Sequence, residues 1–146
     1  MSRDQRIFNF FIKWITLSSL AFSSYIFILS GVESYSGIGS KRIKDKQHLE
    51  QLVEEEIKRM GIENKKISVY IKEGGGICYS KKIEKDTYEI ILSENYLNLT
   101  TLRHELYHIA DGHCDALIEM PISKRQFMYL FWYEPKAVLY ELRQSE

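Results

Sequence analysis

The sequence predicts an α+β fold preceded by one membrane-spanning helix, and three observations support this class. Residues 14–32 contain no Asp, Glu, Lys or Arg, and 19 such residues nearly span a hydrocarbon core of about 30 Å. Helical and β-type patterns of apolar residues then alternate over residues 45–109. A chain of 146 residues, 45% of them hydrophobic, can bury one modest core.

Residues 1–33 are predicted to form a short stub and the transmembrane helix, so the protein is expected in the membrane as a single-pass chain. The side of the membrane stays open, because basic residues flank the span on both sides: Arg3, Arg6, Lys13, Lys41, Arg42, Lys44 and Lys46. A cleaved signal peptide is one alternative, although residues 29–32 make a poor cleavage site, and a buried helix is another. Residues 34–44, rich in Gly and Ser, are predicted to be a tether.

Residues 45–146 are predicted to form one compact domain that begins with a helix and a small sheet. Apolar residues recur at helical spacing over residues 45–60, and Gly61 follows as a stop signal. Alternating residues predict strands at 67–71 and 87–92, with a short strand possible at 77–80 after a glycine turn.

The second half of the domain is predicted to be helical. Asn98 suits the N-cap of a helix that ends near Gly112. A last helical region rich in aromatic residues follows Pro121, and it is expected to bend or restart at Pro135.

The helix after Asn98 carries the residues that predict chemistry. His104 and His108 are four positions apart, so both imidazoles lie on one face and can share a tetrahedral zinc ion. Glu105 lies on the neighbouring arc, where it can act as a general base towards a water molecule activated by the ion. This pattern predicts a zinc site with His104 and His108 as ligands and Glu105 as the catalytic residue.

Residues 102–113 resemble the active-site helix of compact HExxH peptidases of the gluzincin type, especially the ImmA/IrrE group and the HtpX-type membrane peptidases. In those families the third zinc ligand is a Glu from a later helix, within a Glu-x-x-Ala pattern. The segment from Glu134 to Ala137 matches this pattern, so the resemblance implies that Glu134 is the third ligand and that the domain has a minimal zincin fold. Pro135 directly after the ligand departs from the pattern, as does Val138 at a usually polar position.

Other residues compete for the place of the third ligand. His113 follows His108 by five positions, one short of the metzincin spacing. Asp111 lies one turn beyond His108, where a hydrogen bond to that imidazole suits it better than a contact with the ion. Glu119 and Glu141 are further carboxylates within the same half of the chain.

These features predict a membrane-anchored zinc metalloprotease that acts on a protein or peptide substrate. The formal net charge is zero, which gives no reason to expect a nucleic-acid partner. Cys78 and Cys114 are far apart in the sequence and are expected to be free thiols. Two alternatives stay open: a non-catalytic, membrane-tethered interaction module that keeps the fold, and an ImmA/IrrE-like regulator that cleaves a repressor.

Overall fold

The structure is a computed structural model that describes residues 23–25, 40–74 and 76–144. Two units are distinguished, Met1–Tyr35 and Ser36–Glu146, and the fold below is that of the second unit. Its elements in chain order are α2 (Lys46–Met60), β1 (Lys66–Lys72), β2 (Tyr79–Glu84), β3 (Thr87–Ser93), the 3₁₀ turn η1 (Glu94–Tyr96), α3 (Leu99–Ala110), α4 (His113–Glu119), α5 (Ile122–Met128), the π-helical turn η2 (Tyr129–Tyr133) and α6 (Glu134–Gln144).

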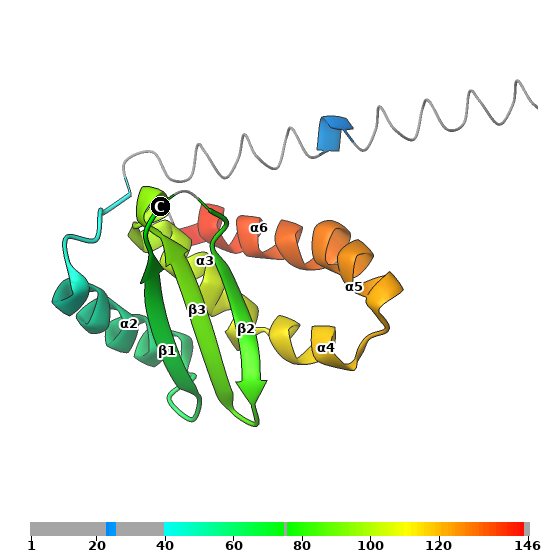
Figure 1. Ribbon diagram of the computed structural model, residues 1–146, viewed down its shortest axis with the longest axis horizontal. Helices are drawn as coiled ribbons and strands as arrows, with labels where there is room; N and C mark the ends of the chain where they lie inside the picture. The colour runs from blue at the N-terminus through cyan, green and yellow to red at the C-terminus, as the bar shows by residue number, and fades with distance from the viewer. Residues whose placement is uncertain (1–22, 26–39, 75, 145–146) are drawn as a thin grey trace, which may run out of the picture. The chain divides into compact units, whose positions relative to one another are not determined.

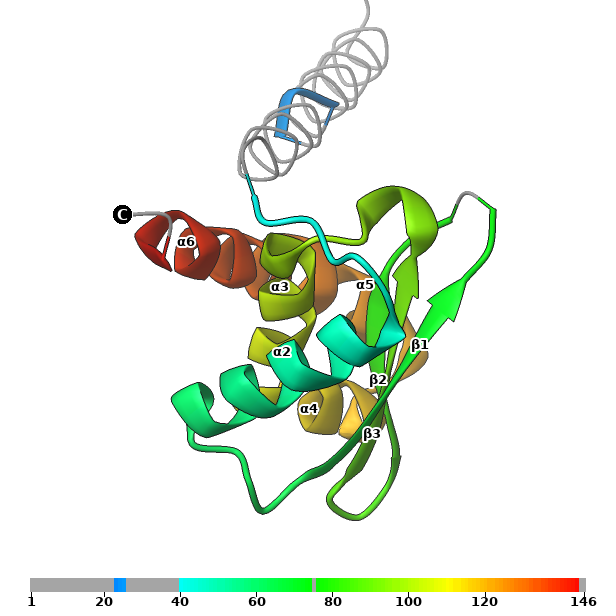
Figure 2. The ribbon, with the colours of Figure 1, turned by 90° about the vertical axis from the view of Figure 1, so that its left-hand side faces the viewer.

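The sheet has three strands in the order β1-β3-β2, with β1 parallel and β2 antiparallel to the central strand β3. Every second residue of β3, namely Tyr88, Ile90 and Leu92, is buried, as expected for a strand with one face against a core. Figure 1 shows the three strands side by side, and Figure 2 shows α2, α3 and α6 on one side of the sheet. Tyr70 of β1, by contrast, leaves 54% of its surface exposed.

Local signals in the sequence account for the first helix. The carboxylate of Asp45 accepts a hydrogen bond of 2.8 Å from the backbone N–H of His48, which caps the N-terminus of α2. At the other end Gly61 adopts a left-handed conformation with φ of 68°, which costs least for glycine. The predicted helix over residues 45–60 and its stop at Gly61 are therefore confirmed.

The helix α3 is the centre of the domain and is buried on more than one face. Its N-cap is Asn98, whose side chain accepts a hydrogen bond of 2.9 Å from the backbone N–H of Thr101, as predicted. Leu102, Leu106 and Ile109 are fully buried on its apolar side. The helix contacts α2, α4, α6 and the strands β2 and β3. Polar residues on its other side therefore face protein rather than water, and this burial creates the candidate site.

An ion-pair cluster joins α2 to α3 beside that site. The buried carboxylate of Glu56 lies 2.8 Å from the guanidinium of Arg103 and 2.6 Å from that of Arg59. Burial opposes ionisation of Glu56, but the two arginines outweigh it and hold the pKa of this carboxyl below its ordinary value. The cluster therefore links the two helices through Glu56 and Arg103.

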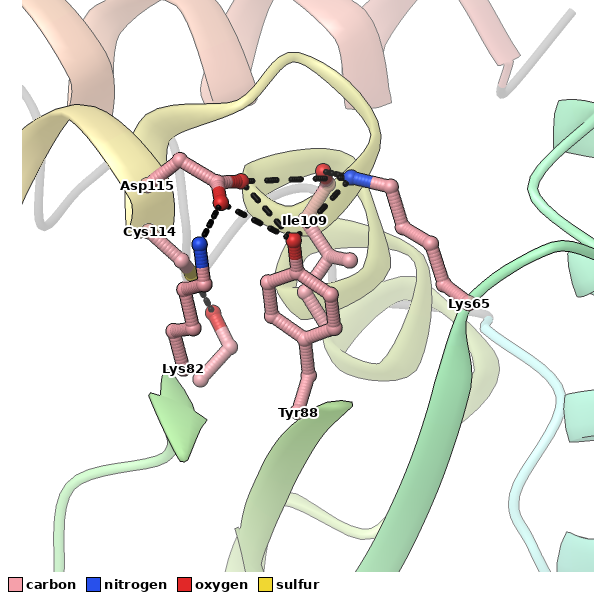
Figure 3. A network of polar contacts seen from close by, with 7 residues as sticks. Lys65, Lys82, Tyr88, Ile109, Cys114 and Asp115 are labelled. Atoms are coloured by element: carbon pink, nitrogen blue, oxygen red, sulfur yellow. Dashed lines mark hydrogen bonds and ion pairs between the residues drawn. The ribbon is translucent and has the colours of Figure 1, made fainter. Parts of the chain in front are cut away.

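A second polar network holds the start of α4 against the sheet (Figure 3). One carboxylate oxygen of Asp115 lies 2.6 Å from the ammonium of Lys82, and the other accepts a hydrogen bond of 2.9 Å from the hydroxyl of Tyr88. Lys65 donates a hydrogen bond of 2.8 Å to the carbonyl of Ile109 near the end of α3. These contacts connect β2, β3 and the residue before β1 with the end of α3 and the start of α4.

The predicted membrane-spanning helix has to be corrected. No helix among the described residues is long and apolar enough to cross a membrane. A span needs about 20 consecutive apolar residues, whereas α2 has 15 residues and carries charged side chains. Most of the predicted span, residues 14–32, lies outside the described residues, which include only 23–25 of it. The α+β class applies to the described domain, but the single-pass membrane localisation and the membrane as a partner are contradicted.

Candidate metal centre

The two histidines of the motif lie one turn apart on the buried face of α3. Only 8% of His104 and 2% of His108 are exposed. Their rings meet edge to face, with centroids 4.8 Å apart, and both turn the Nε2 atom inwards, so that the two Nε2 atoms are 3.1 Å apart. A metal ion could therefore bind both through the same kind of nitrogen atom.

Glu134 joins this pair from a distant part of the chain. Its carboxylate lies 3.2 Å from the Nε2 atom of His104 and 3.4 Å from that of His108. Only 7% of Glu134 is exposed, so water does not compensate for the close approach of three polar groups. The structure thus brings together His104, His108 and Glu134, the three residues expected from the sequence, in a buried cluster that could hold a metal ion.

The helix that carries Glu134 is shaped by the proline next to it. Pro135 has no N–H to donate to the preceding turn, and its ring would collide with a regular turn at that place. The chain forms the π-helical turn η2 instead, in which the N–H of Glu134 bonds to the carbonyl of Tyr129, five residues earlier. The helix α6 then begins at Glu134, as the expected restart near Pro135 requires. This wide turn directs the carboxylate towards α3.

The spacing of the three side chains fits a tetrahedral ion. Ligand atoms bound at about 2.0–2.2 Å to one tetrahedral zinc ion lie roughly 3.3–3.6 Å from one another. Here the two Nε2 atoms are 3.1 Å apart, the Oε2 atom of Glu134 is 3.2 Å from His104, and its Oε1 atom is 3.4 Å from His108. The Oε1 atom of Glu134 is buried and makes no hydrogen bond with the described residues, which leaves an acceptor free for a cation. One ligand atom from each of the three residues lies within 4.8 Å of the others, so the cluster could hold a metal ion.

Glu105 lies on α3 directly beside the first histidine and is also buried, with 3% of its surface exposed. Its Oε2 atom has no hydrogen-bond partner among the described residues. Burial raises the pKa of this carboxyl, although the neighbouring His104 and His108 oppose the shift. A carboxylate whose pKa is raised holds a proton more readily, which is the property that a general base needs.

The pKa of the Glu134 carboxyl is shifted in the opposite direction. Burial opposes its ionisation, but contacts with His104 and His108 outweigh burial and hold its pKa well below the ordinary value. An anionic oxygen is the form that binds a cation. The two buried glutamates of the site are thus suited to different roles, Glu134 to metal binding and Glu105 to proton transfer.

The competing ligands lie elsewhere. His113 is buried, but its Nδ1 atom faces the Nδ1 atom of His108 at 2.8 Å, on the side of that ring opposite to the cluster. Asp111 lies beside His113 and not beside His108: its Oδ2 atom is 2.8 Å from the Nε2 atom of His113. Glu119 is exposed at the end of α4, and the side chain of Glu141 is not among the described ones.

Two tyrosines of the turn η2 pack against the site; the sequence placed both in an aromatic cluster but did not predict their contacts with the histidines. Tyr129 stacks on His108 with ring centroids 5.7 Å apart, and Tyr133 stacks on His113 at 4.2 Å. The aromatic cluster after Pro121 was the only signal, and it does not show which rings turn inwards. The orientation of these two rings depends on the π-helical turn η2, which no pattern in the sequence predicts.

Comparisons with protein-family models, with curated proteins and with solved structures found no match for this chain. The function of the site is therefore argued from its geometry and its chemistry.

Proposed function

We propose that this chain is a zinc-dependent metallopeptidase of the gluzincin type, which hydrolyses peptide bonds in a protein or peptide substrate. One observation carries the proposal: two histidines of α3 and the first residue of α6 converge at distances that suit ligands of one ion. Two histidines and one glutamate form a ligand set found at catalytic zinc sites, where a fourth position is left for water.

The residues have separate tasks in this proposal. His104, His108 and Glu134 hold the ion, and Glu105 is the general base. A zinc ion bound there would supply a Lewis acid, which can polarise a peptide carbonyl and make a water molecule more acidic. Glu105 takes the proton of the attacking water and delivers it to the nitrogen of the leaving amine. Its burial supports this role, because the raised pKa of its carboxyl brings the group closer to neutral pH.

Metal analysis of the purified full chain tests the ligand assignment. We expect about one zinc ion per chain in the wild-type protein and loss of that zinc in His108→Ala. His48→Ala is the matched control, because His48 lies on α2 and hydrogen-bonds to the backbone of Lys44, away from the cluster. Full zinc content in His108→Ala would remove the basis of the proposal.

A further inference from the structure

The imidazole of His108 is contacted at both of its nitrogen atoms. The Nε2 atom faces His104 and Glu134, whereas the Nδ1 atom lies 2.8 Å from the Nδ1 atom of His113. We propose that His113 is a positioning residue of the metal centre, which accepts a hydrogen bond from Nδ1–H of His108 and so keeps the Nε2 lone pair of His108 directed at the ion. This inference rests on the proposed metal site.

The proton positions follow from the carboxylate at the end of this chain of contacts. The Nε2 atom of His113 lies 2.8 Å from the Oδ2 atom of Asp111, and a carboxylate oxygen favours a hydrogen on the ring nitrogen that faces it. The Nε2 atom of His113 makes no regular hydrogen bond with the described residues, so the carboxylate acts on this ring through its charge. A neutral His113 then has a lone pair on Nδ1, and the proton between the two rings belongs to Nδ1 of His108. The Nε2 atom of His108 is left unprotonated, as a metal ligand must be.

The ring of His113 is held in place from several directions. It is 2% exposed and stacks on Tyr133 of η2. It is also the first residue of α4, directly after Gly112, whose left-handed φ of 72° turns the chain back towards α3. Two residues further on, Asp115 is bound by Lys82 and Tyr88 of the sheet (Figure 3). An imidazole fixed in this way can orient its neighbour.

The chain of contacts also returns to the helix of the third ligand. The ammonium of Lys136 lies 3.5 Å from the Oδ2 atom of Asp111, and Lys136 is two residues after Glu134 on α6. Both side chains of this pair are partly exposed, at 44% and 39%, so the ion pair itself is weak. It nevertheless places Asp111 near α6. The contacts therefore lead from His108 of α3 to His113 of α4, then to Asp111, and finally to Lys136 of α6.

A histidine is an unusual partner in this position. The second ring nitrogen of a metal-binding histidine almost always donates to a carboxylate, a backbone carbonyl or water, and loss of that partner typically weakens metal binding 10–100-fold. In this protein a second imidazole stands between the ligand and the carboxylate. The acceptor at Nδ1 of residue 113, rather than its size or charge, is therefore the property to test.

The test compares two substitutions of one residue in the full chain. Asn places an oxygen close to the position of Nδ1, whereas Leu fills the space without an acceptor. We expect His113→Leu to bind zinc 10–100-fold more weakly in a competition with a chromophoric chelator, and His113→Asn to stay within a few fold of wild type. Cys114→Ala, at the next buried residue of α4, controls for loosened packing and should bind zinc as wild type does.

Spectroscopy separates positioning from ligation and from general destabilisation. With Co²⁺ in place of zinc, His113→Asn should keep the visible spectrum of the wild type, because no ligand is lost, while His113→Leu should alter it. In wild-type protein, ¹⁵N NMR should find the proton of His113 on Nε2, a readout that needs no variant to fold. Equal affinities of the Leu and wild-type proteins, loss of metal in the Asn variant, or a proton on Nδ1 of His113 would each overturn the inference. Absence of zinc from the wild type would instead refute the proposed function.

Discussion

Two buried carboxylates, those of Glu105 and Glu134, lie next to the same pair of histidines. Their surroundings shift their pKa values in opposite directions. Glu134 contacts both imidazoles through its oxygens, and these contacts hold its pKa down in spite of burial. Burial dominates at Glu105 and raises its pKa. Such a separation of two acids in one site commonly marks different roles.

This difference leads to a prediction for Glu105→Gln. The variant keeps the size of the side chain and all three proposed ligands, so zinc content should equal that of the wild type. Loss of the general base should reduce peptide hydrolysis by a factor of roughly 10²–10⁴. Cleavage of a quenched fluorescent peptide library by metal-loaded proteins measures the effect. Wild-type turnover by the Gln variant would rule out Glu105 as the base.

The sequence predicted some of the residues that lie beside the proposed metal ligands and missed others. The spacing of His104 and His108 fixes their common face on any α-helix, which is why this pair was predictable. Asp111 was expected near His108, but the chain turns at Gly112 and brings His113 there, so that Asp111 contacts His113. The direction of a chain after a helix ends depends on packing that spacing does not encode.

The helices that have local start or stop signals in the sequence were predictable. Asp45 and Gly61 bound α2, and Asn98 begins α3. The short helix α4 was missed, because no side chain caps its N-terminus. The π-helical turn η2 was also missed, since a widened turn depends on the packing of its tyrosines against His108 and His113 as well as on Pro135.

The contact between α2 and α3 gives a prediction for Glu56→Gln. Removal of this buried charge leaves Arg103 and Arg59 without their ionic partner, and the free energy of unfolding should fall by about 1–3 kcal/mol at neutral pH. Urea denaturation of the metal-free protein measures it.

The same variant has a defined dependence on pH. The pKa of Glu56 is lower in the folded protein than its ordinary value of 4.5, so the unfolded chain binds more protons in acid. The stabilisation is complete above about pH 4.5 and is lost as the pH falls through the lower folded-state pKa. The difference in the free energy of unfolding between wild type and Glu56→Gln should therefore become smaller below that pH. A difference that stays constant down to the acid limit of folding would show that the charge of Glu56 is not its source.

For the whole molecule, the class of the described domain was predictable but its arrangement was not. Apolar periodicity separates helices from strands, which is enough to predict α+β. It cannot show that β3 lies between β1 and β2, because strand order is set by long-range pairing. The predicted membrane span rested on composition over residues 14–32, and no described helix meets the requirements of a span.

Binding of zinc should stabilise the entire domain, because the proposed ligands come from α3 and from α6. An ion that binds only the folded state adds about 2.7 kcal/mol to its stability at a free concentration of 100 times Kd. We expect thermal unfolding of the wild type at a higher temperature with zinc than with a chelator, and no such shift for His104→Ala. Equal shifts in the two proteins would place the stabilising zinc outside this cluster.

We propose that Glu134 is the third ligand of a metal site that also contains the two histidines of α3. Its most direct test is the zinc affinity of Glu134→Ala, with Glu119→Ala, an exposed glutamate on α4, as the matched control. The structure predicts tight binding of one ion by the wild type and by the control, and binding weakened by at least tenfold in Glu134→Ala. Wild-type affinity in Glu134→Ala would contradict the claim and would show that a different residue supplies the third ligand.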